Sequence, residues 1–151
     1  MDRDVYRTAA SSASLTTEAV WVAVILIILS TVGLHFSSLL GYGSGFLIKA
    51  MVIRALGWVG AVFAVHFVAK AHYKVDLPPV AWFRAMVYAQ SALLISIIPI
   101  LGLLVTLWVA ACTVAALQDI SGRDTATGIV LLVIAGIATV AVASIIGTLW
   151  M

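Results

Sequence analysis

Charged residues are scarce in this chain, and cysteine is almost absent. Only 9% of the 151 residues are charged, whereas about 25% is usual in soluble domains. A soluble fold of this size needs many more polar side chains to cover its surface. The 64% of hydrophobic residues and the mean hydropathy of +1.22 suit a protein whose outer surface faces lipid. We therefore predict a single integral membrane domain.

The small number of charges also excludes some partners and some chemistry. The net charge is only +2 and the basic residues are scattered, so the sequence predicts no nucleic-acid partner. The single cysteine, Cys112, lies in an apolar run and offers neither an internal disulfide nor a cysteine-based metal site. The sequence has no catalytic triad, no phosphate-binding glycine loop and no paired carboxylates. We expect no catalytic residues, no metal and no cofactor.

The apolar residues gather into stretches that are long enough to cross a membrane, preceded by a polar cytoplasmic tail at residues 1–16. The run from Ala85 to Leu117 is too long for one crossing, because a helix of that length measures about 50 Å. Pro99 and Gly102 divide it. The predicted spans are residues 18–39, 49–69, 82–98, 101–117 and 125–149. The expected fold class is thus an all-α transmembrane bundle of about five helices, with residues 17–151 as its domain.

The third and fourth spans are short, and two arrangements remain open for them. They either cross a locally thinned membrane or form a hairpin that stops before the far face, and both return the chain to the same side. Trp82, at the start of the third span, is expected at the membrane interface.

The basic residues predict the orientation of the chain. Six of them fall on the N-terminal side of the five-span topology and two on the other side, so the positive-inside rule places the N-terminus in the cytoplasm and the C-terminus outside. The expected location is the bacterial plasma membrane. The six are Arg3, Arg7, Lys70, Lys74, Arg84 and Arg123, and the two are Lys49 and Arg54.

Histidine is the residue type best able to hold a cofactor inside a membrane, and the chain has His35, His66 and His72. A haem between His35 and His66 is excluded in this topology, because their depths differ by about 20 Å. His66 alone is a weak candidate ligand for a tetrapyrrole, since small residues on its helix leave room for a flat ring. The alternative for all three is a polar contact with headgroups or with a neighbouring helix.

Small side chains recur at a spacing of four residues on two predicted helices. Such stripes let two helix backbones approach closely in lipid. We expect these residues to form either an internal helix contact or a contact with a partner protein. They are Gly57, Gly60, Ala61 and Ala64 in the second span, and Ala135, Thr139, Ala143 and Gly147 in the last.

Residues 83–91, the isoleucine-proline and leucine-glycine turn of residues 97–102, and the polar loop of residues 117–123 resemble the bacterial branch of the Yip1 family. The resemblance extends over residues 82–150 and implies about five membrane helices with a cytoplasmic N-terminus. Val87 and Ala92 depart from the pattern, because many relatives have glycine and proline there. Eukaryotic relatives act in vesicle traffic and contact small GTPases, but this chain has little cytoplasmic surface for such a partner.

The function that we expect is that of a non-catalytic membrane scaffold or accessory subunit of a larger membrane assembly, which contacts lipids and other membrane proteins. One alternative is a small transporter or channel, although no acidic residue occupies the interior of a predicted span. Another is a pigment- or haem-binding subunit of an energy-converting complex, photosynthetic or respiratory.

Overall fold

The computed structural model describes the backbone of residues 4–42, 44–91 and 102–149, and the side chains of residues 5–32, 45–91 and 104–149. Every regular element in these ranges is a helix. The elements are α1 (Asp4–Ser11), α2 (Leu15–Tyr42), α3 (Ser44–Tyr73), α4 (Pro79–Gln90), α5 (Gly102–Ser121) and α6 (Thr125–Leu149). The prediction of an all-α helical bundle is confirmed.

Four helices are long and apolar enough to cross a membrane. The apolar stretches are Leu15–Val32 in α2, Gly45–Tyr73 in α3, Leu104–Ser121 in α5 and Thr125–Leu149 in α6. At most 39% of any of these stretches is buried inside the protein. Helices that are apolar on all sides and expose most of that surface are typical of a membrane environment. The chain is therefore a multi-pass integral membrane protein.

The third predicted span begins with α4, which starts at Pro79 and ends at Gln90. Proline suits a first helical position, since the N–H that it lacks would have no partner there. The 12 residues of α4 rise about 18 Å, less than the hydrocarbon thickness of about 30 Å. The predicted turn at Pro99 lies outside the described residues.

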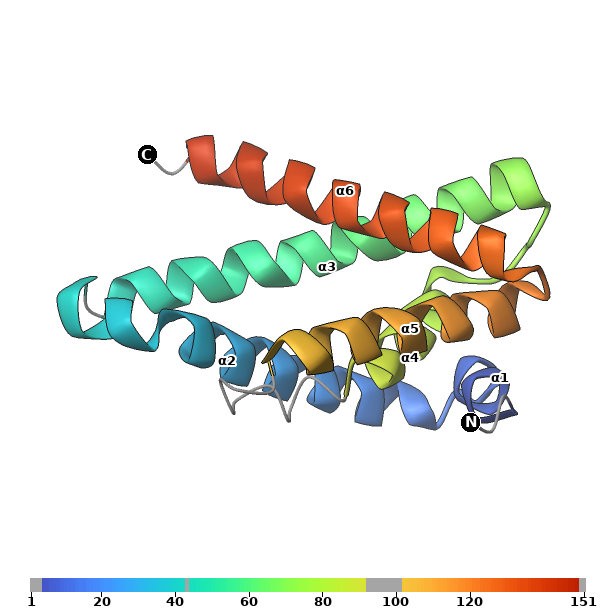
Figure 1. The fold of residues 1–151 in the computed structure, drawn as a ribbon, viewed down its shortest axis with the longest axis horizontal. Coiled ribbons are helices and arrows are strands. Elements are labelled where there is room, and N and C mark those ends of the chain that lie inside the picture. Colours follow the sequence, from blue (N-terminus) through green and yellow to red (C-terminus); the bar gives the residue numbers. More distant parts are fainter. Residues whose placement is uncertain (1–3, 43, 92–101, 150–151) are drawn as a thin grey trace.

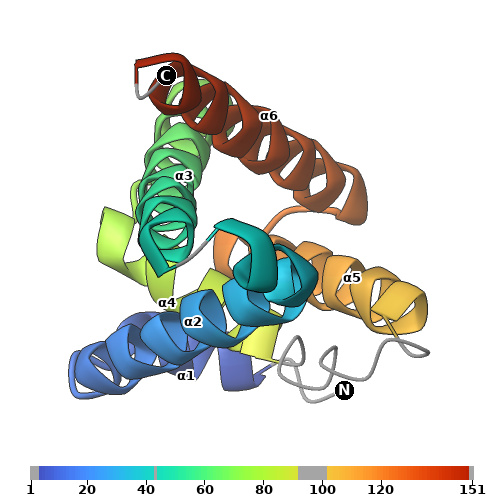
Figure 2. The same cartoon turned by 90° about the vertical axis from the view of Figure 1, so that its left-hand side faces the viewer.

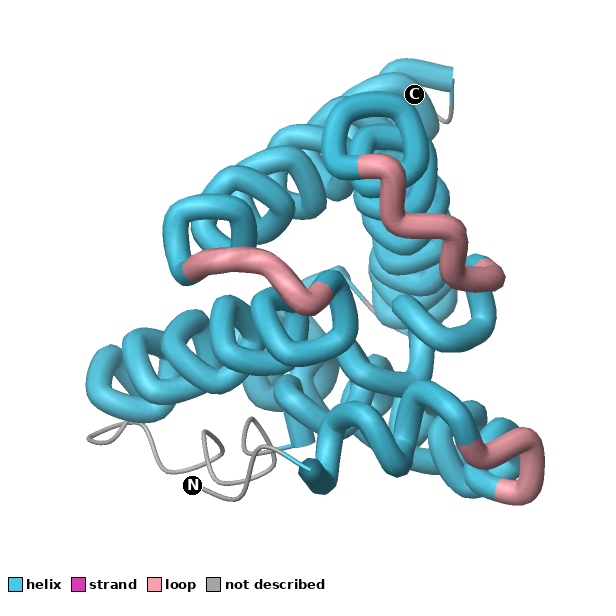
Figure 3. Tube along the Cα trace, turned by 90° about the vertical axis from the view of Figure 1, so that its right-hand side faces the viewer, coloured by secondary structure: helices cyan, strands magenta, loops and turns pink. Residues whose placement is uncertain are grey.

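The long helices α2, α3, α5 and α6 run roughly along one axis, and the described connections between the helices lie near its two ends (Figure 1). The α1 end comprises α1, the loops at residues 12–14, 74–78 and 122–124, and the helix turns next to these loops; α1 and the loops face the viewer in Figure 3. The far end is where α2 ends, α3 begins and α6 ends. Figure 2, which looks along the bundle from the far end, shows α3 and α6 as one pair, with α4 placed among α2, α3 and α5.

The core lies where α4 meets the long helices. Trp82 is fully buried and packs with Val65 of α3, Leu117 of α5 and Leu131 of α6. The expectation that Trp82 lies at the membrane interface is therefore wrong, because its side chain packs in the core of the bundle rather than against lipid.

Of the predicted polar tail, residues 4–16 are described, and they form α1, a short connection and the beginning of α2. Figure 1 shows α1 nearly end-on, so it lies across the bundle axis. Tyr6 and Ala9, three residues apart, share its buried face, and Tyr6 packs with Ala85 and Cys112. Helix α1 is therefore a folded part of the bundle, packed on α4 and α5.

Candidate functional site

The small-residue stripes of α3 and α6 meet each other. A Cβ atom added to Gly57 would lie 3.1 Å from Cγ2 of Thr139, and one added to Gly60 would lie 2.7 Å from Cγ2 of Val142. The Thr139 hydroxyl donates a hydrogen bond to the carbonyl of Ala135 at 2.8 Å and lies 3.5 Å from the carbonyl oxygen of Gly57. Glycine at residues 57 and 60 therefore permits the close approach of the two helices.

The remaining stripe residues have different surroundings. Ala61 and Ala135 are buried in the main core, and Ala64 is half-buried. Ala143 is half-buried and lines a cavity between α2, α3 and α6. A Cβ added to Gly147 would meet no atom within 4 Å. The internal contact thus uses the middle of the α6 stripe and leaves its last residue open.

His66, the candidate tetrapyrrole ligand, is half-buried in α3. Its Nδ1 atom is buried and has no hydrogen-bond partner among the described residues. Its ring meets Phe67 edge-on, with 5.8 Å between the ring centroids. His72 is exposed near the end of α3, and the side chain of His35 lies outside those described. No group of three or more metal-binding side chains occurs within the described part of the chain.

Arg84 of α4 is buried beneath α1 and joins α1 to α4. Its guanidinium donates hydrogen bonds to the main-chain carbonyls of Ala10 and Ser12, and to the hydroxyl of Thr16 at 3.3 Å. The last carbonyls of a helix have no partner within the helix and carry partial negative charge. Arg84 therefore caps the C-terminal end of α1 from a different helix.

Two more arginines make the same kind of contact. Nε of Arg7 in α1 donates to the carbonyl of Asp119, near the end of α5, at 3.1 Å. Arg123, in the loop before α6, donates to the carbonyl of Tyr73, the last residue of α3. At the α1 end, the C-terminal ends of α1, α5 and α3 are thus each bonded by an arginine from another element. We call Arg84, Arg7 and Arg123 the arginine caps.

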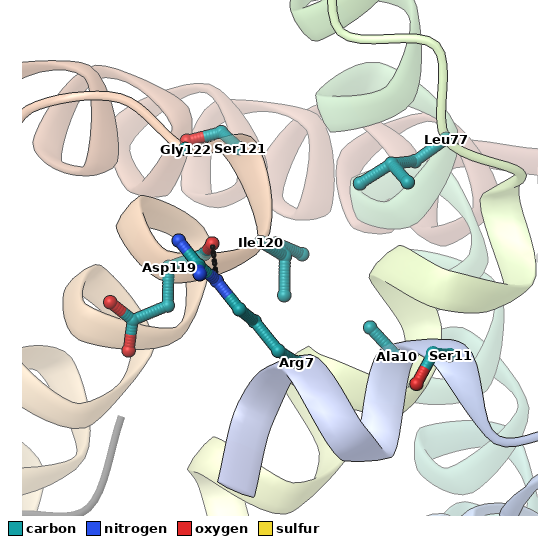
Figure 4. Close-up of a pocket in the computed structure, with 8 residues that line it drawn as sticks. All are labelled: Arg7, Ala10, Ser11, Leu77, Asp119, Ile120, Ser121 and Gly122. Carbon is teal, nitrogen blue, oxygen red and sulfur yellow. Dashed lines mark hydrogen bonds between the residues drawn. The ribbon is translucent and has the colours of Figure 1, made fainter. Parts of the chain in front are cut away.

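A cavity of about 290 Å³ lies beside the second of these caps (Figure 4). It is lined by α1, by Leu77 and by the end of α5. Figure 4 shows the Arg7 guanidinium reaching across to the main chain of α5, while the carboxylate of Asp119 points away from Leu77. Oδ2 of that carboxylate is buried and has no hydrogen-bond partner among the described residues.

Tyr6 lies on the same face of α1 as Ala9. Burial raises the pKa of the Tyr6 phenol to about 12, and the neighbouring Cys112 and Asp119 add to the rise. The phenol therefore stays protonated at neutral pH and behaves as part of the packing between α1 and α5.

The start of α6 has a side-chain cap of its own. Oδ1 of Asp124 accepts hydrogen bonds from the backbone N–H of Thr127 at 3.0 Å and from its hydroxyl at 2.6 Å. These bonds lower the pKa of the Asp124 carboxyl, with the hydroxyl of Thr127 as the largest cause. In the preceding turn, Gly122 has a φ of 65°, and the N–H of Arg123 bonds to the carbonyl of Gln118, which is the glycine ending expected of a helix.

No protein-family model, curated protein or solved structure matches this chain. The class that the fold itself defines is an all-α, multi-pass integral membrane protein with a hydrogen-bonded cap of polar side chains at one end.

Proposed function

We propose that this protein is a non-catalytic scaffold or accessory subunit of a larger membrane assembly, of the bacterial Yip1-like kind. The observation that supports this proposal is the set of arginine caps. Arg84, Arg7 and Arg123 hold helix ends together across α1, α3, α4 and α5, so they give the membrane bundle a fixed shape at one end. A fixed bundle with outward apolar faces suits the binding of neighbouring membrane proteins.

The outer face of α6 is the surface that we assign to a partner. Helix α6 packs on α3 and α5, yet only 11% of its span is buried in the protein. Gly136, Val140 and Ser144 are exposed along one line of this helix, and a Cβ added to Gly136 would meet no atom within 4 Å. The proposed occupant is a transmembrane helix of another protein, because small residues permit close approach in lipid.

Purification in a mild detergent, followed by identification of the proteins that remain bound, tests this assignment. We expect Gly136→Leu to leave the thermal stability unchanged and to remove a membrane protein that copurifies in stoichiometric amount with the wild type. The matched control is Ala111→Leu, which enlarges an exposed small residue of α5 instead. If both variants retain the same proteins as the wild type, the outer face of α6 faces lipid and the assignment is wrong.

Two other functions are distinguished by direct measurements. Solute flux in liposomes that contain only this protein would indicate a transporter or channel. A visible absorption band that copurifies with the protein and disappears in His66→Ala would indicate a pigment- or haem-binding subunit. We expect no flux and no such band.

We also propose that the N-terminus lies in the cytoplasm, the C-terminus lies outside, and the protein resides in the bacterial plasma membrane. The supporting observation is the excess of basic residues at the α1 end, compared with two in the half of α3 nearer the far end. The residues at the α1 end are Arg7, Lys70, Lys74, Arg84 and Arg123, and the two nearer the far end are Lys49 and Arg54.

Cysteine labelling with a membrane-impermeant reagent tests this orientation. In a variant whose native Cys112 is replaced by alanine, we expect a cysteine at Ser44 to react in intact cells. A cysteine at Ser14, which is exposed at the α1 end, should react only after lysis. The opposite pattern would reverse the topology.

A further inference from the structure

The far half of the bundle contains a cavity with two basic side chains. It measures about 460 Å³ and is lined by residues of α2, α3 and α6. Lys49 and Arg54 of α3 contribute the positive charge, while Phe46 and Ile53 contribute apolar walls. A volume of this size suits a small molecule or a lipid headgroup.

A buried hydroxyl lines the same cavity. Thr31 of α2 is only 1% exposed, and its Oγ1 atom has no hydrogen-bond partner among the described residues. Buried polar atoms nearly always have a partner, so an unpaired hydroxyl beside two basic groups indicates a bound group that accepts hydrogen bonds.

No acidic side chain in the described ranges pairs with Arg54. The acidic residues that the structure describes all lie in or next to the α1 end, and they are Asp4, Glu18, Asp76, Asp119 and Asp124. Arg54 makes no hydrogen bond or ion pair with any residue in the described ranges. An arginine within a membrane span normally pairs with another polar or charged group, and here the described acidic residues are at the opposite end.

The depth of the cavity favours a lipid as the source of that group. Helix α3 has 30 residues and measures about 45 Å, about 15 Å more than the hydrocarbon core. When the helix is centred in the bilayer, Lys49 lies near the edge of that core and Arg54 about 7 Å inside it. The cavity therefore lies where the phosphate and glycerol groups of lipids meet the acyl chains.

We propose that this cavity binds a phosphate group, and specifically the phosphate of an anionic phospholipid. The guanidinium of Arg54 offers paired N–H donors that match phosphate oxygens, and Lys49 adds a point charge. The Thr31 hydroxyl donates a further hydrogen bond, and the apolar walls contact the start of the acyl chains. This site is independent of any partner protein on α6.

Binding of phosphatidylglycerol to the purified full-length protein, titrated in detergent by native mass spectrometry, tests the proposal. We expect the wild type to bind one lipid at this site, and Arg54→Gln to bind it at least tenfold more weakly. Arg54→Lys should keep part of the affinity, and Thr31→Val should weaken binding several-fold without changing the net charge. The control is Lys70→Gln, which removes one charge from the α1 end of the same helix and should bind like the wild type.

Inorganic phosphate, titrated in the same way, distinguishes the source of the phosphate. If phosphatidylglycerol binds and millimolar inorganic phosphate does not compete, the ligand is a lipid. If inorganic phosphate alone binds in an Arg54-dependent manner, the phosphate site stands and the lipid assignment is wrong. Equal binding of phosphatidylglycerol by the wild type, Arg54→Gln and Thr31→Val overturns the proposal.

Discussion

The α1 end and the contacts of α6 are stabilised by different chemistry. At the α1 end, arginine side chains donate to the carbonyls of helix ends, so polar groups join the elements. Along α6, glycines let the backbones approach until a side-chain or carbonyl atom lies only 2.7 to 3.1 Å from where a Cβ would be. The arginine caps depend on charge and hydrogen bonding, whereas the glycine contacts depend only on shape.

The difference follows from the surroundings of each region. Helix ends carry carbonyls without partners, and these need a donor from water or from a side chain. Helix interiors have no such need, and in lipid no hydrophobic effect brings them together, so association depends on close packing. Substitutions in the two regions should therefore destabilise the protein for different physical reasons.

The largest loss of stability is expected from a substitution of Arg84. Arg84→Met keeps an apolar stem of similar length but removes the donors to Ala10, Ser12 and Thr16. Because hydrogen bonds to a charged group contribute about 1.5 to 3 kcal/mol each, and the half-buried acceptors lose their partner, we expect a loss of about 3 kcal/mol. Thermal unfolding in detergent measures this loss, and limited proteolysis should show cleavage near residue 14.

The matched control for Arg84 is Arg123→Met. It removes the same kind of cap from an exposed arginine, for which water can replace the lost donor, so we expect less than about 1 kcal/mol. If the two variants lose equal stability, burial does not set the strength of the caps. If Arg84→Met keeps the protease resistance of the wild type, Arg84 does not hold α1 on the bundle.

The next largest loss of stability is expected from a substitution of Gly128 in α6. A Cβ there would lie 2.7 Å from the carbonyl oxygen of Val114 in α5, and backbone atoms cannot rotate away. We expect Gly128→Ala to cost about 1 to 3 kcal/mol through overpacking. Gly136→Ala is the control on the same helix, because its Cβ would meet open space. Thermal unfolding should show a lower transition for the first variant and no decrease for the second.

The loss of stability in Gly60→Ala should lie between the losses in Gly128→Ala and Gly136→Ala. Its Cβ would lie 2.7 Å from Cγ2 of Val142, which is a side-chain atom, so the clash can be relieved in part by moving that side chain. Valine has few alternative rotamers in a helix, so the relief is incomplete. An unfolding temperature for Gly60→Ala below that of Gly128→Ala would contradict this order.

The sequence was sufficient to predict the all-α membrane fold and to single out the two small-residue stripes, but not to predict that the stripes pack against each other. Hydrophobicity and four-residue spacing are local properties, and Gly57 and Thr139 could be singled out from them alone. The structure then showed that these two residues lie against each other.

The sequence did not reveal the arginine caps or the burial of Trp82. Whether Arg84 faces headgroups or the end of α1 depends on where an eight-residue helix at the N-terminus docks, and the composition of residues 1–16 carries little information about that. The signal that was present is Tyr6 and Ala9 spaced three residues apart, which places them on one face of a short helix. The sequence misplaced Trp82 because it does not show that this side chain packs among α3, α5 and α6.

The smallest effect is expected from the pH dependence of the cap at Asp124, a polar contact at the start of the helix that elsewhere packs through glycine. Its hydrogen bonds with Thr127 hold the folded-state pKa of the carboxyl below the ordinary value of 3.8. A lowered pKa means that the contribution to stability is present above about pH 4 and is lost as the pH falls through the folded-state pKa.

Asp124→Asn keeps a capping oxygen but does not titrate. Because other carboxylates titrate in the same range, the quantity to measure is the difference in unfolding temperature between the wild type and Asp124→Asn. We expect this difference to be constant from pH 7 to about pH 5 and to shift against the wild type as the pH falls below about 4. A difference that stays constant down to pH 3 would show that the charge of Asp124 contributes nothing to the start of α6.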